Sequence, residues 1–157
     1  MNWGSLLFSY QGRINRAKYW LAILVYILVT IVAGIIGFAS GSDQLATSLN
    51  GLVNLATFIS GILVGIKRLH DRDKSGWWLL LFYIVPGVLF GIGAGIMLFG
   101  LVADSSGLGG AASIFFLAGA AIILWAFVEL GCLRGTVGPN QYGPDPLAPA
   151  PQGAPAV

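Results

Sequence analysis

The sequence contains very little charge. Eight Lys and Arg and six Asp and Glu residues make up 9% of the 157 residues, whereas hydrophobic residues make up 57%. Soluble domains carry about 25% charged residues. This deficit excludes an ordinary soluble domain and predicts that most of the chain lies in a lipid bilayer.

Residues that support catalysis are equally scarce. Cys132 and His70 are the only residues of their types, which excludes intramolecular disulfides and paired Cys metal motifs. A metal-dependent enzyme would have to use His70, Asp71 and Asp73, but four cations in the same stretch oppose a metal ion, and catalytic zinc usually takes three protein ligands. The sequence has no P-loop or GxSxG motif. We therefore expect no enzymatic activity, no cofactor, no metal and no nucleic-acid partner.

Four long apolar segments are present, and each is close to the ~20 residues that a helix needs to cross a bilayer. They predict an all-α membrane domain over residues 19–134, with spans at 19–38, 48–66, 77–103 and 111–133. A cleaved signal peptide is excluded because the first apolar segment is too long and three more follow.

The basic residues predict the orientation of these spans. All eight lie on one side of the membrane domain, whereas the two loops on the other side carry only Asp43 and Asp104. Short loops rich in Lys and Arg remain cytoplasmic. Both termini and the loop between spans two and three are therefore expected to face the cytoplasm of a bacterial inner membrane.

The two ends of the chain differ in character. In residues 1–18, apolar side chains recur at helical spacing, which predicts a short amphipathic helix on the cytoplasmic leaflet or, equally, a frayed lead-in: Trp3, Leu6, Leu7, Tyr10 and Ile14. Residues 135–157 form a Pro- and Ala-rich cytoplasmic tail, which we expect to be extended and disordered at least beyond Pro146.

The stretch KRLHDRDKSGWW, residues 67–78, holds six of the fourteen charged residues. Its basic residues can contact lipid phosphates, and Trp77 and Trp78 suit the depth of the headgroups. One interpretation is a rigid, ion-paired turn that sets how spans two and three meet. The other is a binding site for anionic lipid or a partner protein, with these candidates: Arg13, Arg16, Lys67, Arg68, His70, Asp71, Arg72, Asp73, Lys74, Trp77 and Trp78.

Polar residues inside the spans are the remaining candidates. Asn50, Asn54 and Thr57 share one face of span two with two glycines, which favours helix packing over the lining of a solute path. Glu129 in span four favours a structural ion pair over a proton relay. In span three, Pro86 predicts a kink or a break, and Gly87, Gly91 and Gly95 have the spacing of a close helix contact.

Three short blocks carry a family resemblance: GRINRAKYW at 12–20, KRLHDRDKSGWW at 67–78 and GPNQYGPDP at 138–146. In this order around four apolar spans, roughly from residue 8 to 146, the chain resembles the bacterial inner-membrane proteins of domain-of-unknown-function family 805. The resemblance implies an inner-membrane protein with four spans and implies no reaction.

The leading functional hypothesis is a non-enzymatic inner-membrane module whose cytoplasmic face, built from the three blocks, binds anionic lipid or a partner protein. A homo-oligomer fits the same pattern. The alternatives are a component of a small-solute or ion transporter or channel and, less favoured, a metal-dependent membrane enzyme.

Overall fold

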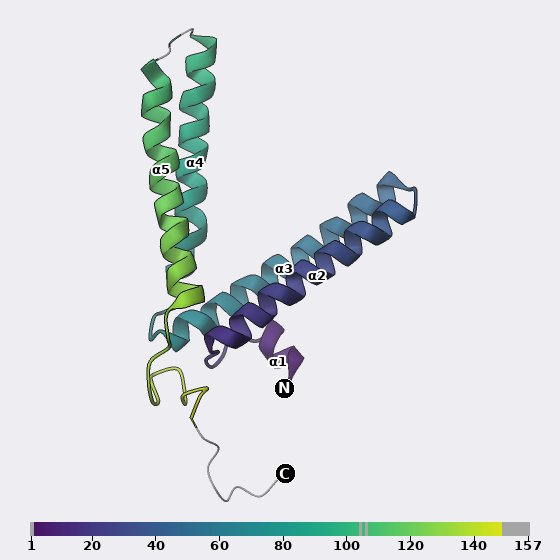
Figure 1. Cartoon of the computed structure of the whole chain (residues 1–157), viewed down its shortest axis with the longest axis vertical. Coiled ribbons are helices and arrows are strands. Elements are labelled where there is room, and N and C mark those ends of the chain that lie inside the picture. The colour runs from purple at the N-terminus through teal and green to yellow at the C-terminus, as the bar shows by residue number, and fades with distance from the viewer. Residues whose placement is uncertain (1, 104, 106, 149–157) are drawn as a thin grey trace, which may run out of the picture. The chain divides into compact units, whose positions relative to one another are not determined.

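The computed structural model describes residues 2–103, 105 and 107–148. The chain is helical, and Figure 1 shows the helices arranged as two hairpins. The elements in chain order are α1 (Trp3–Phe8), α2 (Arg16–Ala39), α3 (Asp43–Asp71), α4 (Trp78–Val102), α5 (Gly107–Phe127) and a π-helical turn η1 (Val128–Cys132). The chain divides into two compact units, which are described separately: residues 1–74 with 134–157 form unit 1, and residues 75–133 form unit 2.

Four of these helices are long and apolar enough to cross a membrane, which confirms the predicted all-α class and the four spans. The helix that contains span two is longer than the predicted span of residues 48–66. Helix α3 begins at Asp43 and continues to Asp71, so the charged residues 67–71 belong to its last turns and only residues 72–77 form the connection. The prediction of a loop at residues 67–71 is therefore wrong, because charged side chains can also end a helix when they are buried against partners.

Helices α2 and α3 pack through small residues. Ala22, Ala33 and Gly37 are the buried positions of α2, and a Cβ atom on Gly37 would lie 2.9 Å from the Cβ atom of Ala46. On α3, Ser60 and Val64 are buried near the middle and the end of the same contact. Small side chains allow two helices to approach closely without a hydrophobic driving force in lipid.

Capping side chains define where these two helices begin. The Asn15 side chain accepts a hydrogen bond of 2.9 Å from the backbone N–H of Lys18, and the Ser42 hydroxyl accepts one from Leu45. Both residues have extended backbone, as expected for an N-cap. Gly41, with a φ of +64°, provides the left-handed residue that the short α2–α3 turn requires.

The amphipathic helix expected in residues 1–18 is shorter than the periodicity suggested. Helix α1 ends at Phe8, and Gly12 has a φ of +83°, so the chain bends before α2. Leu6 and Ile14 are nevertheless buried together against Ala22 and Val64. The apolar spacing therefore reflects a shared core that is reached through a bend, rather than one continuous helix.

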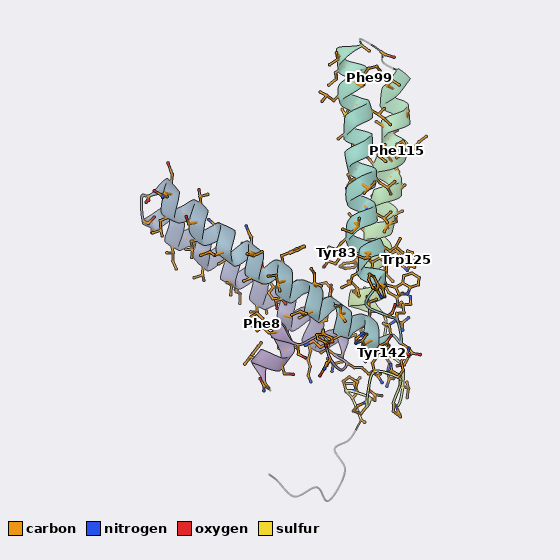
Figure 2. The ribbon with its side chains drawn as sticks, turned by 180° about the vertical axis from the view of Figure 1, so that it is seen from behind. Phe8, Tyr83, Phe99, Phe115, Trp125 and Tyr142 are labelled. Carbon is orange, nitrogen blue, oxygen red and sulfur yellow. The ribbon has the colours of Figure 1, made fainter. Side chains whose placement is uncertain are left out.

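Unit 2 is an antiparallel pair of helices with aromatic contacts along its length, and Figure 2 labels Phe99, Phe115 and Trp125 on it. The ring of Trp125 meets Phe82 and Trp78 edge-on, with centroids 5.4 and 5.7 Å apart. Gly119 lies against Phe90, since a Cβ atom there would be 2.7 Å from the Phe90 ring.

The break considered at Pro86 in span three is absent, whereas the kink stays a prediction. Helix α4 continues through Pro86 without a break. A Cβ atom on Gly87, Gly91 or Gly95 would meet no atom within 4 Å among the described residues, so these three glycines do not form the close contact with α5. The tight contact uses Gly93 instead, where a Cβ atom would lie only 3.2 Å from the backbone oxygen of Ala112.

Candidate functional site

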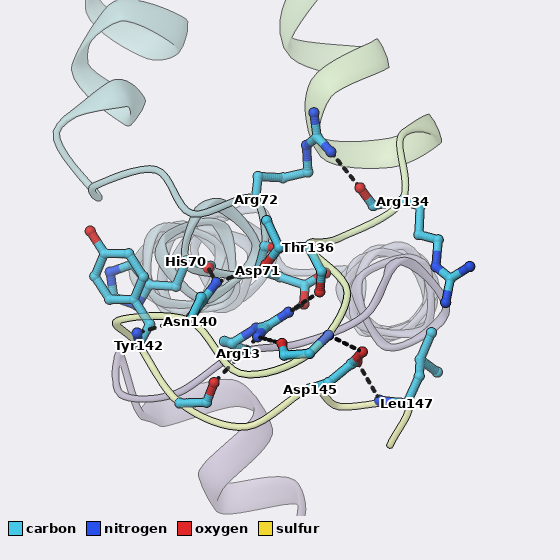
Figure 3. Close-up of polar contacts among 12 residues, drawn as sticks. Arg13, His70, Asp71, Arg72, Arg134, Thr136, Asn140, Tyr142, Asp145 and Leu147 are labelled. Atoms are coloured by element: carbon cyan, nitrogen blue, oxygen red, sulfur yellow. Dashed lines mark hydrogen bonds and ion pairs between the residues drawn. The ribbon is translucent and has the colours of Figure 1, made fainter. Parts of the chain in front are cut away.

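The most polar part of unit 1 is built around Asp71, the last residue of α3. One carboxylate oxygen accepts hydrogen bonds from Nε and Nη2 of Arg13, at 3.2 and 3.1 Å. The other accepts from Nη1 of Arg68 at 2.5 Å. The three side chains are at most 3% exposed. We call them the ion triad, and Figure 3 shows Arg13 and Asp71 at its centre.

The C-terminal segment closes over this triad. Residues 134–147, which we call the C-terminal strap, pass around the Arg13 guanidinium in Figure 3. Arg13 donates hydrogen bonds to three strap carbonyls, those of Thr136 at 2.6 Å, Gly138 at 2.7 Å and Gly143 at 3.2 Å. All five N–H groups of the guanidinium therefore have acceptors. A buried ionic group is stabilised only when such hydrogen bonds complete its shell.

The strap also binds the backbone at the end of α3. The N–H of Thr136 donates to the Asp71 carbonyl at 2.8 Å, and the Asn140 side chain donates to the carbonyl of His70 at 2.9 Å. Asn140 and Gly143 exchange backbone hydrogen bonds, which close a tight turn. These contacts satisfy helix-end carbonyls that otherwise lack partners within the helix.

Gly135 is required by this close approach. A Cβ atom at this position would overlap the carboxylate of Asp71. The strap can therefore reach the ion triad only because residue 135 has no side chain. The sequence places Gly135 directly after Arg134, at the point where the chain leaves η1.

His70 is held between the N-terminal and C-terminal segments. Its ring stacks on Tyr142 with centroids 3.8 Å apart and planes 4° from parallel. Its Nδ1 lies 3.3 Å from the carbonyl oxygen of Gly12, so this nitrogen is the donor. His70 therefore contacts both of the segments that flank the end of α3.

Asp73 ends helix α3. It has a left-handed φ of 57°, and the N–H groups of Asp73 and Lys74 donate to the carbonyls of His70 and Leu69. This is a Schellman arrangement, in which Asp takes the position that Gly usually occupies. The Asp73 carboxylate also accepts a hydrogen bond from the Gln141 side chain at 3.2 Å.

Two further contacts order the strap itself. Arg72 donates a hydrogen bond to the carbonyl of Arg134. Backbone N–H groups of Leu147 and Gly138 donate to the Asp145 carboxylate and lower the pKa of Asp145 below its ordinary value. A carboxylate is favoured over its acid when it accepts such bonds.

The remaining predicted residues of this region fall into two groups. Lys67 is buried and donates to the carbonyls of Ser5 and Leu6 at 2.6 and 2.5 Å. Arg16 and Trp77 are exposed, whereas Lys74 and Trp78 are half-buried. The structure thus places part of the predicted surface inside the fold and leaves part of it accessible.

The intramembrane candidates belong to both units and are described within each. Asn50 and Thr57 are half-buried and donate to carbonyls of their own helix, those of Ala46 and Val53 at 2.9 Å. Asn54 is exposed. Glu129 is buried in η1, in unit 2. A π-helical turn often marks a functional position, and the structural ion pair expected at Glu129 stays a prediction.

Sequence reasoning missed several residues that build the site. Ser60 joins α1 to the hairpin, because its hydroxyl donates to the Leu7 carbonyl and bonds the Tyr26 hydroxyl, both at 2.7 Å. Thr136 and Gly135 lay outside every predicted motif. The spacing of polar residues on α3 was the available signal for Ser60, and no local signal existed for the other two.

No group of three His, Cys, Asp or Glu residues could hold a metal ion in the part of the chain that the structure describes. His70, Asp71 and Asp73 lie within one stretch of four residues but contact different partners, namely Tyr142, Arg13 and Gln141. The arrangement binds segments of the protein to one another.

Four long apolar helices, with a polar network at one end of the first pair, define a multi-pass membrane protein. The model of the family described as "Protein of unknown function (DUF805)" matches residues 7–144, and the chain belongs to this family. The predicted family is thereby confirmed.

Curated relatives agree with this assignment. Inner membrane protein YhaI of Escherichia coli (strain K12) is 31% identical over 138 residues, covering 88% of this chain and 86% of the relative. Inner membrane protein YhaH of the same strain is 30% identical over 143 residues, covering 88% and 87%. Uncharacterized protein YiiR is 29% identical over 139 residues, covering 88% and 86%. No solved structure matches the chain. The protein is a multi-pass inner-membrane protein.

Proposed function

We propose that the protein is a non-enzymatic inner-membrane module whose cytoplasmic face binds the headgroups of anionic phospholipids. In this proposal both termini and the 72–77 connection face the cytoplasm. The support is the distribution of charge, because all eight Lys and Arg residues lie on that side of the four spans. Short loops with this bias remain cytoplasmic.

The observation that carries the proposal is a pair of exposed arginines beside one cavity. Arg16 is the first residue of α2, and Arg134 begins the C-terminal strap. Both line a cavity of about 170 Å³ together with Asn15 and Leu147. Each basic residue near an anionic leaflet is worth about 1 kcal/mol, so two at one cavity favour a bound headgroup.

The carboxylates at this cavity are already engaged. Asp71 binds Arg13 and Arg68, and Asp145 accepts from backbone N–H groups within the strap. The ion triad therefore has a supporting role in the proposal: it holds the strap in place so that Arg134 lies at the same cavity as Arg16.

Native mass spectrometry of the full chain, extracted from its own membrane in mild detergent, tests the proposal. The Arg16→Gln/Arg134→Gln variant should carry less bound phosphatidylglycerol and cardiolipin than the wild type. The Arg16→Lys/Arg134→Lys variant keeps both charges and should retain them. Identical lipid adducts on all three proteins would contradict the proposal.

A further inference from the structure

A second cavity lies at the same end of unit 1 and is distinct from the one beside Arg134. It has a volume of about 320 Å³ and lies between α1, the loop that follows it, the start of α2 and the end of α3. This volume is at the lower end of the range for small-molecule sites. Its lining residues most relevant to ligand chemistry are Asn2, Gln11, Lys18 and Lys67.

Lys67 is a buried cation in this lining, with only 2% of its surface exposed. An ammonium group has three N–H donors. Two of them reach neutral acceptors, the carbonyls of Ser5 and Leu6. Among the described residues no carboxylate pairs with Lys67, although a buried charge normally requires an opposite one.

Lys18 adds a second positive charge to the same cavity. It is the third residue of α2, is half-buried and acts on Lys67 as a like charge. The lining residues in the described chain include no Asp or Glu to offset the two ammonium groups. Arg13 also lines the cavity, but its guanidinium is fully occupied by Asp71 and the strap.

We propose that this cavity binds a phosphate group, either that of a phospholipid headgroup or a soluble phosphate. A phosphate offers several acceptor oxygens, which suits the ammonium groups of Lys18 and Lys67 with the amides of Asn2 and Gln11 at hand. Lys18 and Lys67 lie near the ends of two spans, where phospholipid phosphates are found. The proposal that the phosphate belongs to a lipid rests on the proposed function. The proposal that Lys18 and Lys67 bind a phosphate group does not.

The test uses Lys18→Gln in the full detergent-solubilised chain, because Lys18 is half-buried and its loss leaves the α1 contacts of Lys67 intact. Titration calorimetry with inorganic phosphate and with glycerol 3-phosphate probes the soluble source. Native mass spectrometry with dioleoylphosphatidylglycerol probes the lipid source. A lost charge-assisted hydrogen bond should weaken binding roughly tenfold or more.

Two comparison variants distinguish binding at this site from non-specific attraction by positive charge. Lys18→Arg keeps the cation and should keep binding. Lys74→Gln removes one charge from the same end of unit 1 without lining the cavity, and should bind as the wild type does. If Lys18→Gln weakens the binding of lipid alone, the ligand of the cavity is a phospholipid headgroup. If it also weakens the binding of soluble phosphate, the cavity binds phosphate independently of lipid.

The proposal is overturned if the wild type binds none of the probes, if Lys18→Gln binds them all as the wild type does, or if Lys74→Gln weakens binding equally. Loss of lipid in Arg16→Gln/Arg134→Gln with none in Lys18→Gln would leave the proposed function standing and remove this site. Loss of bound lipid in Lys18→Gln alone would contradict lipid binding at the Arg16–Arg134 cavity and support binding at this one.

Discussion

Arg13 and Asp71 are 58 positions apart in the sequence and form a buried ion pair with an N–O distance of 3.1 Å. Asp71 shares its second oxygen with Arg68, so one carboxylate neutralises part of the charge of two guanidinium groups. Carbonyl groups of the strap accept the remaining hydrogen bonds of the Arg13 guanidinium. The pair thus connects the N-terminal segment, the end of α3 and the C-terminal strap.

Removing the charge of Asp71 should be strongly destabilising. Asp71→Asn removes the carboxylate charge that Arg13 and Arg68 share, and breaking a buried ion pair costs about 3–5 kcal/mol. The measurement is the free energy of unfolding in detergent micelles. Asp43→Asn, in the exposed first turn of α3, is the matched control and should cost less than about 1 kcal/mol. Equal losses in both variants would contradict the role given to the ion triad.

A methyl group at residue 135 should displace the strap. In Gly135→Ala the new Cβ atom would overlap the Asp71 carboxylate, and inserting atoms into a packed site costs about 1–3 kcal/mol. Limited proteolysis should then cleave residues 134–147 faster than in the wild type. Gly34→Ala is the control, because a Cβ atom there meets no described atom within 4 Å. An uncleaved strap in Gly135→Ala would show that the close approach does not exist.

Stacking on His70 should depend on the ring of Tyr142 and not on its hydroxyl. Tyr142→Leu removes the stacked ring, and an aromatic pair is worth about 0.5–1.5 kcal/mol beyond its buried area. Tyr142→Phe retains the ring and should behave as the wild type does. Chemical denaturation of the three proteins compares them. A loss of stability in Tyr142→Phe as large as in Tyr142→Leu would assign the effect to the hydroxyl.

The strap should loosen in acid. Backbone N–H groups lower the pKa of Asp145 in the folded state, so its stabilising contribution is full above the ordinary aspartate pKa of about 4. That contribution is lost as the pH falls from this value through the lower folded-state pKa. Arg13 and Arg134 act in the same direction. The rate at which pepsin cleaves the strap is measured at each pH in the wild type and in Asp145→Asn. The ratio of the two rates should change across this pH range, because only the wild type loses the Asp145 charge; a constant ratio would exclude Asp145.

Orientation is tested by cysteine labelling. In a Cys132→Ala background, Gln44→Cys and Ala148→Cys place single thiols at exposed positions at opposite ends of the α2–α3 hairpin and its strap. A membrane-impermeant maleimide applied to intact spheroplasts should label Gln44→Cys only, and lysis should expose Ala148→Cys. Labelling of Ala148→Cys before lysis would reverse the proposed topology.

The spans were predictable from sequence because the bilayer imposes a minimum length of apolar helix. The charged end of α3 was not, since Lys67, Arg68 and Asp71 find their partners in segments more than fifty residues away or within their own turn. A single sequence gives no pairing information at that distance. The mixed charge of residues 67–74 is visible in the sequence, but the contacts of Lys67 with α1 and of Asp71 with the C-terminal strap are not.

The spacing of apolar residues and of glycines gave incomplete predictions where more than one structure could explain it. The apolar spacing of Leu6 and Ile14 indicated one helix, yet the two residues reach a common core around a bend at Gly12. The spacing of Gly87, Gly91 and Gly95 indicated a contact, yet the neighbouring face with Gly93 makes it. The spacing of residues shows that they share a face of a helix. Which face packs against a neighbouring segment depends on that segment and cannot be read from the spacing.

Hydrogen exchange of the strap amides tests the central claim most directly, namely that the ion triad holds the three segments in one folded unit. The N–H groups of Thr136, Gly138, Asn140 and Gly143 all have acceptors in this structure. Mass spectrometry should find them protected in the wild type and exchanging freely in Asp71→Asn, while the middle of α2 is unchanged. Free exchange in the wild type, or equal protection in both proteins, would contradict the account.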